Sequence, residues 1–203
     1  MRKIIVIGIA VLGLVGCKAI AMKMNGMTDP QLENAQTIRE KAHAFGMDTT
    51  NIVTVHSKDF PNELKRSGIP DALIYDRNGN YIEYRATDTS CNAGLFQFIP
   101  DLKLNTTYNQ PAAISLDELW KKYRDLNGNM LAAVEPADFY VLIYWTAWSG
   151  KLNKDHVKIW EDLAKANTNC SIKVIKVNLD LQDYWEEGDK KTLVEAMTGK
   201  KKK

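Results

Sequence analysis

The segment Trp148-Ser149-Gly150-Lys151-Leu152 is the clearest candidate for chemistry in the chain, because it joins two elements of different type. Residues 139–147 are apolar and have the composition of a buried strand, and residues 153–167 carry apolar side chains at helical spacing. The turn after such a strand is where α/β proteins commonly bind ligands. Ser149 would be a weak nucleophile there without an adjacent base. We predict no catalytic residue, because no triad spacing is found among the three histidines, His43, His56 and His156.

Cys17 predicts a different chemistry, namely attachment to lipid. It follows a basic start and an uncharged apolar run from Ile4 to Leu14, an order typical of a secretory signal peptide. Leu14-Val15-Gly16-Cys17 resembles a bacterial lipobox, which implies cleavage after residue 16, a diacylglycerol on the Cys17 thiol and an acyl chain such as palmitate on the new amino terminus. Such chains contribute about 0.8 kcal/mol per buried methylene, so two or three anchor a protein stably. The alternative is an ordinary signal peptide in which Cys17 is incidental.

Cys91 and Cys170 remain once Cys17 is assigned to lipid, and an even number outside the cytosol allows one disulfide. Either thiol could instead carry redox chemistry if it were exposed and readily ionised. The chain has no Cys-x-x-Cys motif to support that role. We therefore expect a Cys91–Cys170 disulfide or two unreactive thiols rather than a redox pair.

Charge and residue spacing argue against several other classes of function. The 203 residues include 27 Lys and Arg and 25 Asp and Glu, and two of the positive charges lie in the predicted signal peptide. The remainder is close to neutral, and no basic stripe with interleaved aromatic residues indicates nucleic-acid binding. The histidines lie far apart in sequence, with no acid or cysteine at a metal-ligand spacing. We expect no nucleic acid, metal or cofactor.

Three short segments resemble the thioredoxin superfamily. Its members carry Trp-Cys-Gly-Pro-Cys-Lys at a strand-to-helix junction, where this chain has Trp148-Ser149-Gly150-Lys151-Leu152-Asn153. The family's Val/Ile-Pro, strand and Asp-x-x-Gly turn are similar to Ile69-Pro70 and Asp76-Arg77-Asn78-Gly79, and its Val-Asp/Asn-x-Asp strand end is similar to Val177-Asn178-Leu179-Asp180. The resemblance implies that Pro70 is cis and lies against residues 148–152, which we call the degenerate site.

The resemblance also implies what the degenerate site cannot do. A thioredoxin-type enzyme needs a thiolate at the helix amino terminus, where the helix dipole stabilises it, and Ser149 stands in that place. Leu152 replaces the cysteine that would resolve a mixed disulfide. Thiol–disulfide exchange by the family's route is therefore excluded. We expect Trp148 to be the most exposed tryptophan, with Trp145 and Trp160 in the core.

The elements around this site predict an α/β fold, a thioredoxin-like mixed sheet flanked by helices. In the family the active-site β-α-β unit precedes the proline and hairpin, whereas here it follows them, so the connections are permuted or partly duplicated. We favour one mixed sheet, because neither part alone has the strands to close a core. The predicted elements are a helix at 30–45 with Asp29 as N-cap, a strand at 51–56, a helix at 58–67, a hairpin within 67–84, a helix at 116–126 opened by a Ser115–Glu118 capping box, a strand at 170–180 and a helix at 189–198.

The predicted organisation of the chain is a signal peptide at 1–16, a tether at 17–28, a domain at 29–199 whose parts 29–85 and 115–199 are joined by a polar loop at 86–114, and a lysine tail at 200–203. We expect a binding or scaffold module on the periplasmic or outer-surface face of a bacterial membrane, with a protein or peptide partner. The alternatives are a thiol-disulfide oxidoreductase using Cys91 or Cys170, and a carrier of a small solute or peptide in a groove beside Trp148 and Pro70.

Overall fold

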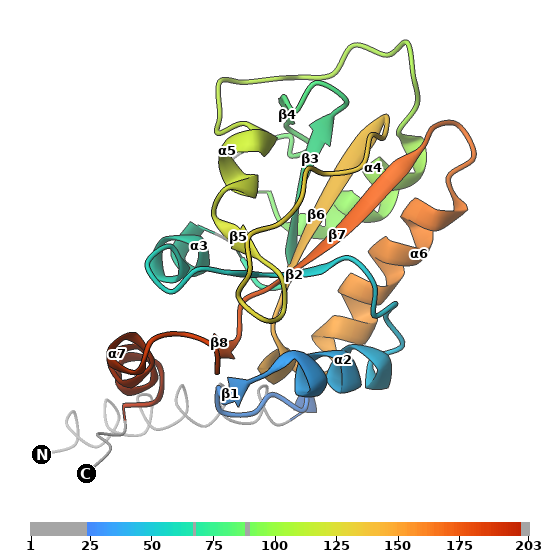
Figure 1. Cartoon of the computed structure of the whole chain (residues 1–203). Helices are drawn as coiled ribbons and strands as arrows, with labels where there is room; N and C mark the ends of the chain where they lie inside the picture. Colours follow the sequence, from blue (N-terminus) through green and yellow to red (C-terminus); the bar gives the residue numbers. More distant parts are fainter. Residues whose placement is uncertain (1–23, 67, 88–89, 200–203) are drawn as a thin grey trace, which may run out of the picture.

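The computed structural model describes residues 24–66, 68–87 and 90–199. The predicted signal peptide, Cys17, most of the tether and the lysine tail lie outside the described residues. Within them the chain forms a six-stranded mixed sheet flanked by helices, so the predicted α/β class is confirmed (Figure 1). None of the helices in these ranges has the length and apolar character needed to cross a membrane.

The sheet has strands from both halves of the chain in the order β4-β3-β6-β7-β2-β5. The neighbouring strands β6, β7 and β2 are parallel to one another, whereas β3, β4 and β5 are antiparallel to the strands they pair with. Their bounds are β2 (Ile52–Val55), β3 (Asp71–Asp76), β4 (Tyr81–Ile82), β5 (Tyr123–Arg124), β6 (Phe139–Trp145) and β7 (Ile172–Asn178). The predicted strands at 51–56, 139–147 and 170–180 and the hairpin within 67–84 are confirmed.

Strand β6 lies between β3 and β7 within the sheet, and every one of its residues is buried. Its side chains alternate between two cores, as the two-residue period of a strand requires. Val141, Ile143 and Trp145 face one core, whereas Leu142 and Tyr144 face the other. A fully apolar strand with both faces covered is typical of parallel sheets.

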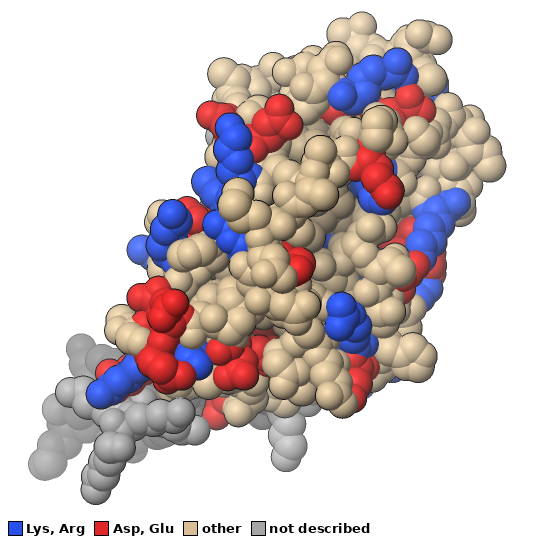
Figure 2. Space-filling model, in the orientation of Figure 1, with Lys and Arg blue, Asp and Glu red and all other residues tan. Residues whose placement is uncertain are grey.

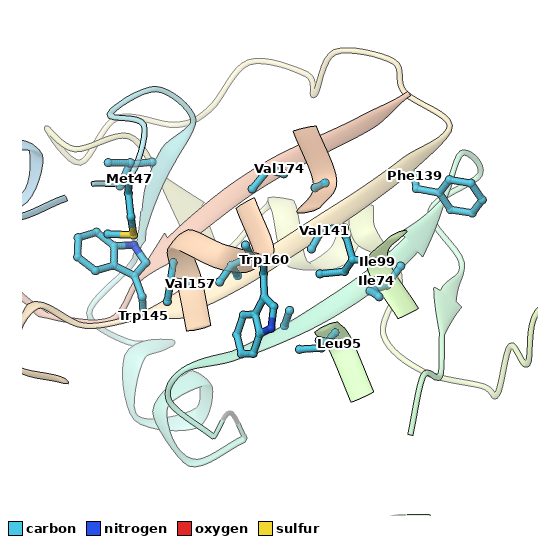
Figure 3. Close-up of a cluster of buried hydrophobic side chains, with 14 of the residues drawn as sticks. Met47, Ile74, Leu95, Ile99, Phe139, Val141, Trp145, Val157, Trp160 and Val174 are labelled. Carbon is cyan, nitrogen blue, oxygen red and sulfur yellow. The ribbon is translucent and has the colours of Figure 1, made fainter. Parts of the chain in front are cut away.

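The first core lies under helices α2 (Ala35–Ala44), α4 (Leu95–Asp101) and α6 (Ile159–Ala166), which Figure 1 shows on one side of the sheet. Figure 3 shows Trp160 and Val157 from the α6 side packed with Leu95 and Ile99 of α4 against Val141 and Ile74. Trp145 and Trp160 are fully buried, which confirms their predicted place in the core.

The second core lies under helices α3 (Phe60–Arg66), α5 (Leu116–Trp120) and α7 (Glu187–Thr198). Helix α3 confirms the predicted helix at 58–67, and α7 confirms the last helix, with Gly199 closing it in a left-handed conformation. Acidic and basic side chains are interspersed on the face shown in Figure 2, in keeping with their near balance in the sequence.

The predicted start of the first helix is wrong. The helix begins at Ala35 rather than Pro30, because Asn34 accepts hydrogen bonds from the Gln36 and Thr37 amides and forms a capping box with Thr37. The residues before it, β1 (Leu32–Glu33), instead pair in parallel with β8 (Leu181–Gln182). The strand pairing holds this segment extended, so Asp29 caps no helix.

Two further predictions are wrong in the middle of the chain. The segment 86–114 is not a plain polar loop, because it contains the short 3₁₀ turn η1 (Asn92–Gly94) and α4, whose Leu95 and Ile99 are fully buried. The helix expected at 116–126 begins at the predicted capping box but ends at Trp120. Residues Tyr123–Arg124 pair with β2 instead of continuing the helix.

Candidate functional site

The degenerate site lies at the carboxyl edge of the sheet. Strand β6 ends at Trp145 and is followed by a 3₁₀ turn, η2 (Ala147–Ser149), then by Gly150 and a π-helical segment, η3 (Asn153–Lys158), that runs into α6. Trp145 pairs with Asn178, the last residue of β7, so the segments after both strands meet at this edge. The predicted helix at 153–167 is confirmed, with an opening turn wider than an α-helix.

Ser149 is buried and already engaged. Its side chain has no exposed surface, and its Oγ lies 2.6 Å from Thr146 Oγ1, with which it shares a hydrogen bond. His156 on the same segment packs its ring against Phe96 and Trp160, with centroids 5.7 and 5.5 Å away. The Ser149 hydroxyl is therefore not accessible, its hydrogen-bond partner is another hydroxyl rather than a base, and Ser149 is a structural residue of the turn.

Asp180 supports the turn from the neighbouring strand, and sequence reasoning did not assign it a role. Its Oδ2 accepts hydrogen bonds from the Ala147 N–H at 2.7 Å and from Asn178 Nδ2 at 2.6 Å. Burial removes water from the carboxyl group and raises its pKa to about 7, and the nearby charge of Glu33 adds to the rise. The Asp180 side chain is thus a titratable group that holds the first residue of η2.

A polar layer around Asp180 fixes the rest of the turn. Asn153 Nδ2 donates to the Thr146 carbonyl at 2.8 Å, and Gln182 Nε2 donates to Asn178 Oδ1 at 2.9 Å and to the Asp180 carbonyl at 2.8 Å. These residues are almost fully buried. The donated hydrogen bonds favour one conformation of the loop, although three buried oxygens of the layer, Asn153 Oδ1, Asp180 Oδ1 and Gln182 Oε1, have no hydrogen-bond partner among the described residues.

The last residues of the predicted tether cross the degenerate site. The Thr28 N–H donates to the Trp148 carbonyl at 3.0 Å, and the Lys151 N–H donates to the Asn25 carbonyl at 2.7 Å. Gly150, with φ at +59°, lies beneath this crossing: a Cβ on it would lie 2.3 Å from the Asn25 carbonyl oxygen and 2.4 Å from that of Gly26. Only glycine fits there. Trp148 is partly exposed, and so is Trp120, so the structure does not single out Trp148 as the most exposed tryptophan.

Pro70 lies at the same edge of the sheet. The Ile69–Pro70 peptide bond is cis, as the resemblance implied. Asp71 pairs with Tyr144 in the antiparallel β3–β6 ladder, so Pro70 comes just beyond this pair, at the end of β6 that leads into the degenerate site. The Pro70 carbonyl accepts a hydrogen bond from Asn92 Nδ2 at 2.6 Å. Pro70 and the Val177–Asp180 segment therefore lie at the same edge of the sheet as the degenerate site, whereas the Asp76–Gly79 turn lies at the opposite edge, where Asp76 pairs with the first residue of β6.

Cys91 and Cys170 do not form the disulfide that was one of the two expectations. Both are free: Cys91 is exposed just before η1, and Cys170 is partly buried just before β7, with its Sγ donating to the Leu102 carbonyl at 3.3 Å. Asn92, next to Cys91, contacts Pro70 at the carboxyl end of β6, whereas Cys170 precedes Ile172, which pairs with the first residue of β6. The length of β6 therefore separates the two thiols. Burial raises the pKa of the Cys170 thiol, which makes it less reactive.

No group of three or more His, Cys, Asp or Glu that could hold a metal ion is found in the described part of the chain. Comparison of the chain with models of known protein families, with curated proteins and with solved structures finds no match. The site is therefore interpreted from its own residues.

Proposed function

We propose that this chain is a lipid-anchored protein of the bacterial cell envelope whose thioredoxin-like domain has no redox chemistry and serves as a binding or scaffold module. The observation that carries the absence of redox chemistry is the burial of Ser149, which has no exposed surface and shares a hydrogen bond with Thr146. The lipid anchor rests on the sequence Leu14-Val15-Gly16-Cys17. A buried, engaged hydroxyl stands where the family has a reactive thiolate.

The sheet supports the thioredoxin-like assignment. Parallel β6 and β7, joined by a helix, lie beside antiparallel β3 and β4, and a cis proline precedes β3. The β3–β4 hairpin and the β6–β7 unit come from different parts of the chain yet belong to one sheet, which favours permuted connections over two partial units.

A thiol-disulfide oxidoreductase using Cys91 is the second candidate. Cys91 is exposed, and its neighbour Asn92 contacts the Pro70 carbonyl, so this thiol lies on the Pro70 side of the degenerate site. Among the described residues it has no second cysteine beside it, because Cys170 is at the other end of β6. A single thiol could form a mixed disulfide but could not resolve it within the chain.

Two measurements test the proposal. The anchor is tested by the mass of the purified protein and by cell fractionation: we expect acyl chains on Cys17, and a Cys17→Ala variant that no longer sediments with membranes. A soluble parent protein without acyl chains would refute the anchor. The non-redox role is tested by a disulfide-reduction assay on the parent and on Cys91→Ala; activity in the parent that Cys91→Ala abolishes would establish the oxidoreductase instead.

A further inference from the structure

Residues 25–28, which we call the strap, are bound to the degenerate site by backbone contacts. The two hydrogen bonds Thr28 N–H to Trp148 carbonyl and Lys151 N–H to Asn25 carbonyl bracket the crossing. At its centre the backbone of Asn25 and Gly26 lies so close to Gly150 that no other residue type fits there. The contact between the strap and the degenerate site thus depends on the lack of a side chain at Gly150 as well as on the two hydrogen bonds.

The loop that holds the strap is fixed to the sheet. Asp180 holds Ala147 and Asn153 holds Thr146, and both of these side chains are fully or almost fully buried. Because this loop is fixed to the sheet, the strap bound to it cannot rotate freely relative to the domain. Any force on the amino-terminal part of the chain is therefore transmitted to the sheet edge at Trp148.

We propose that the strap orients the domain on the membrane, so that the carboxyl edge of the sheet, with the degenerate site, faces the lipid surface. This inference rests on the proposed lipid anchor at Cys17. Cys17 and Asn25 are eight positions apart, and eight residues span at most about 28 Å even when fully extended. The degenerate site is thus held within that distance of the anchor, and its partner is the lipid surface itself.

The opposite edge of the sheet points away from the membrane in this orientation. It carries the beginning of β6 and the exposed segment around Thr106, which line a cleft of about 270 Å³ together with Arg77 and Asp138. The seven residues of β6 extend roughly 23 Å at about 3.3 Å per residue. Labels placed at the two edges therefore differ measurably in their distance from lipid.

The orientation is tested with the full-length acylated protein in phosphatidylcholine vesicles that contain a headgroup-labelled acceptor lipid. Cys91 and Cys170 are replaced by serine, and one donor dye is attached at Lys151→Cys or at Thr106→Cys, both exposed positions at opposite edges. We expect energy transfer to lipid from position 151 to exceed that from position 106 by about twofold or more. Equal transfer from the two positions, or stronger transfer from 106, would overturn the orientation.

Gly150→Ala removes the strap contact, and Gly199→Ala is its control. Both glycines have positive φ, at +59° and +66°, but a Cβ at Gly199 meets nothing within 4 Å. Gly150→Ala should bring the two transfer values close together, whereas Gly199→Ala should keep the parent difference. A difference that survives in folded Gly150→Ala would refute the strap as its cause.

Hydrogen exchange separates failure of the strap from failure of the anchor. In the acylated parent in detergent micelles, the Thr28 and Lys151 amides should exchange about 100-fold or more slowly than exposed amides. Fast exchange of both would overturn the strap even if Cys17 carries lipid. Slow exchange in a protein that proves to have no acyl chains would keep the strap contact but overturn the anchor and, with it, the orientation.

Discussion

The carboxylate of Asp180 accepts a hydrogen bond from the Ala147 N–H at 2.7 Å, so the second residue after β7 holds the first residue of η2, the turn that follows β6. Asp180 is almost completely buried, and Glu33 and Lys41, which form an ion pair, lie near enough to influence its charge. The conformation of the degenerate site thus depends on a buried carboxyl group rather than on a disulfide, and this relationship leads to a prediction about pH.

Stability should fall as the pH rises through the range in which Asp180 loses its proton. Burial raises its pKa from 3.8 to about 7, so the folded protein binds this proton more tightly than the unfolded chain does. Between these two values the folded state carries more protons, and the free energy of unfolding therefore decreases with increasing pH. Asp180→Asn should abolish this component and raise stability at pH 8 by about 2 kcal/mol.

Urea unfolding of the parent and of Asp180→Asn at pH 5 and pH 8 checks this prediction. The variant's advantage should be large at pH 8 and small or reversed at pH 5, because the protonated carboxyl group costs little to bury. A variant that is equally destabilised at both pH values would indicate that Asp180 acts only through its shape and hydrogen bonds.

Gly150→Ala should destabilise the protein more than a glycine replacement that causes backbone strain alone. A Cβ at Gly150 would overlap the backbone of Asn25 and Gly26, whereas Gly199 has the same sign of φ and free space around it. We expect a loss of about 3 kcal/mol for Gly150→Ala and about 1 kcal/mol for Gly199→Ala, measured by urea unfolding. Equal losses of stability in the two variants would mean that the strap moves away from Gly150 with little loss of free energy.

Two thiols besides Cys17 should titrate in the native protein, with or without prior reduction. Cys91 is exposed and should react at once, whereas Cys170 is partly buried, donates its hydrogen to the Leu102 carbonyl and has a raised pKa. A thiolate-directed reagent should therefore label Cys170 at least about tenfold more slowly. Thiols that appear only after reduction would contradict the unpaired state of both cysteines.

The buried ion pair between Lys176 and Glu161, 2.7 Å apart, should matter for the attachment of α6 to β7. Among the described residues, Lys176→Met leaves the buried Glu161 carboxylate with only the more exposed Lys165 as a cationic partner, 3.3 Å away. Breaking a buried pair in this way costs about 3 kcal/mol or more. The double variant Lys176→Met/Glu161→Gln should recover at least half of that loss in the same unfolding assay. A double variant no more stable than Lys176→Met would assign the loss to packing.

Much of the sheet could be predicted from the sequence because its signals are local. The apolar runs of β6 and β7 are long and rich in β-branched and aromatic residues, and the Asp76–Gly79 turn fixes the hairpin between β3 and β4. The capping box at Ser115 gave the correct start of α5 for the same reason.

The errors occur where distant contacts override local preference. Asp29-Pro30 is a good helix start, but Leu32 and Glu33 pair with β8, and the helix begins only after Asn34. Helix α5 ends early because Tyr123 pairs with Val55 of β2. Helix α4 is short and contains Pro100, so its sequence has little helical signal. It is stabilised by packing against α6 and the sheet and by Asn167 Nδ2, which donates to the Ile99 and Pro100 carbonyls.

The candidate site was only half predictable. The Trp148–Leu152 segment and Pro70 could be found from motif spacing, because each follows or precedes a strand with a clear pattern. The role of Asp180 could not, since a sequence does not reveal that the turn after β6 closes over the end of β7. The seating of residues 25–28 on Gly150 depends on tertiary contacts in the same way.

The most direct test of the central claim is the rate at which the full-length protein catalyses reduction of insulin disulfides by dithiothreitol. Because Ser149 is buried and Leu152 has no thiol, we predict a rate equal to that of dithiothreitol alone, for the parent and for Cys91→Ala and Cys170→Ala alike. A parent rate above this background, lost in either cysteine variant, would show that the domain is a redox enzyme and contradict the account.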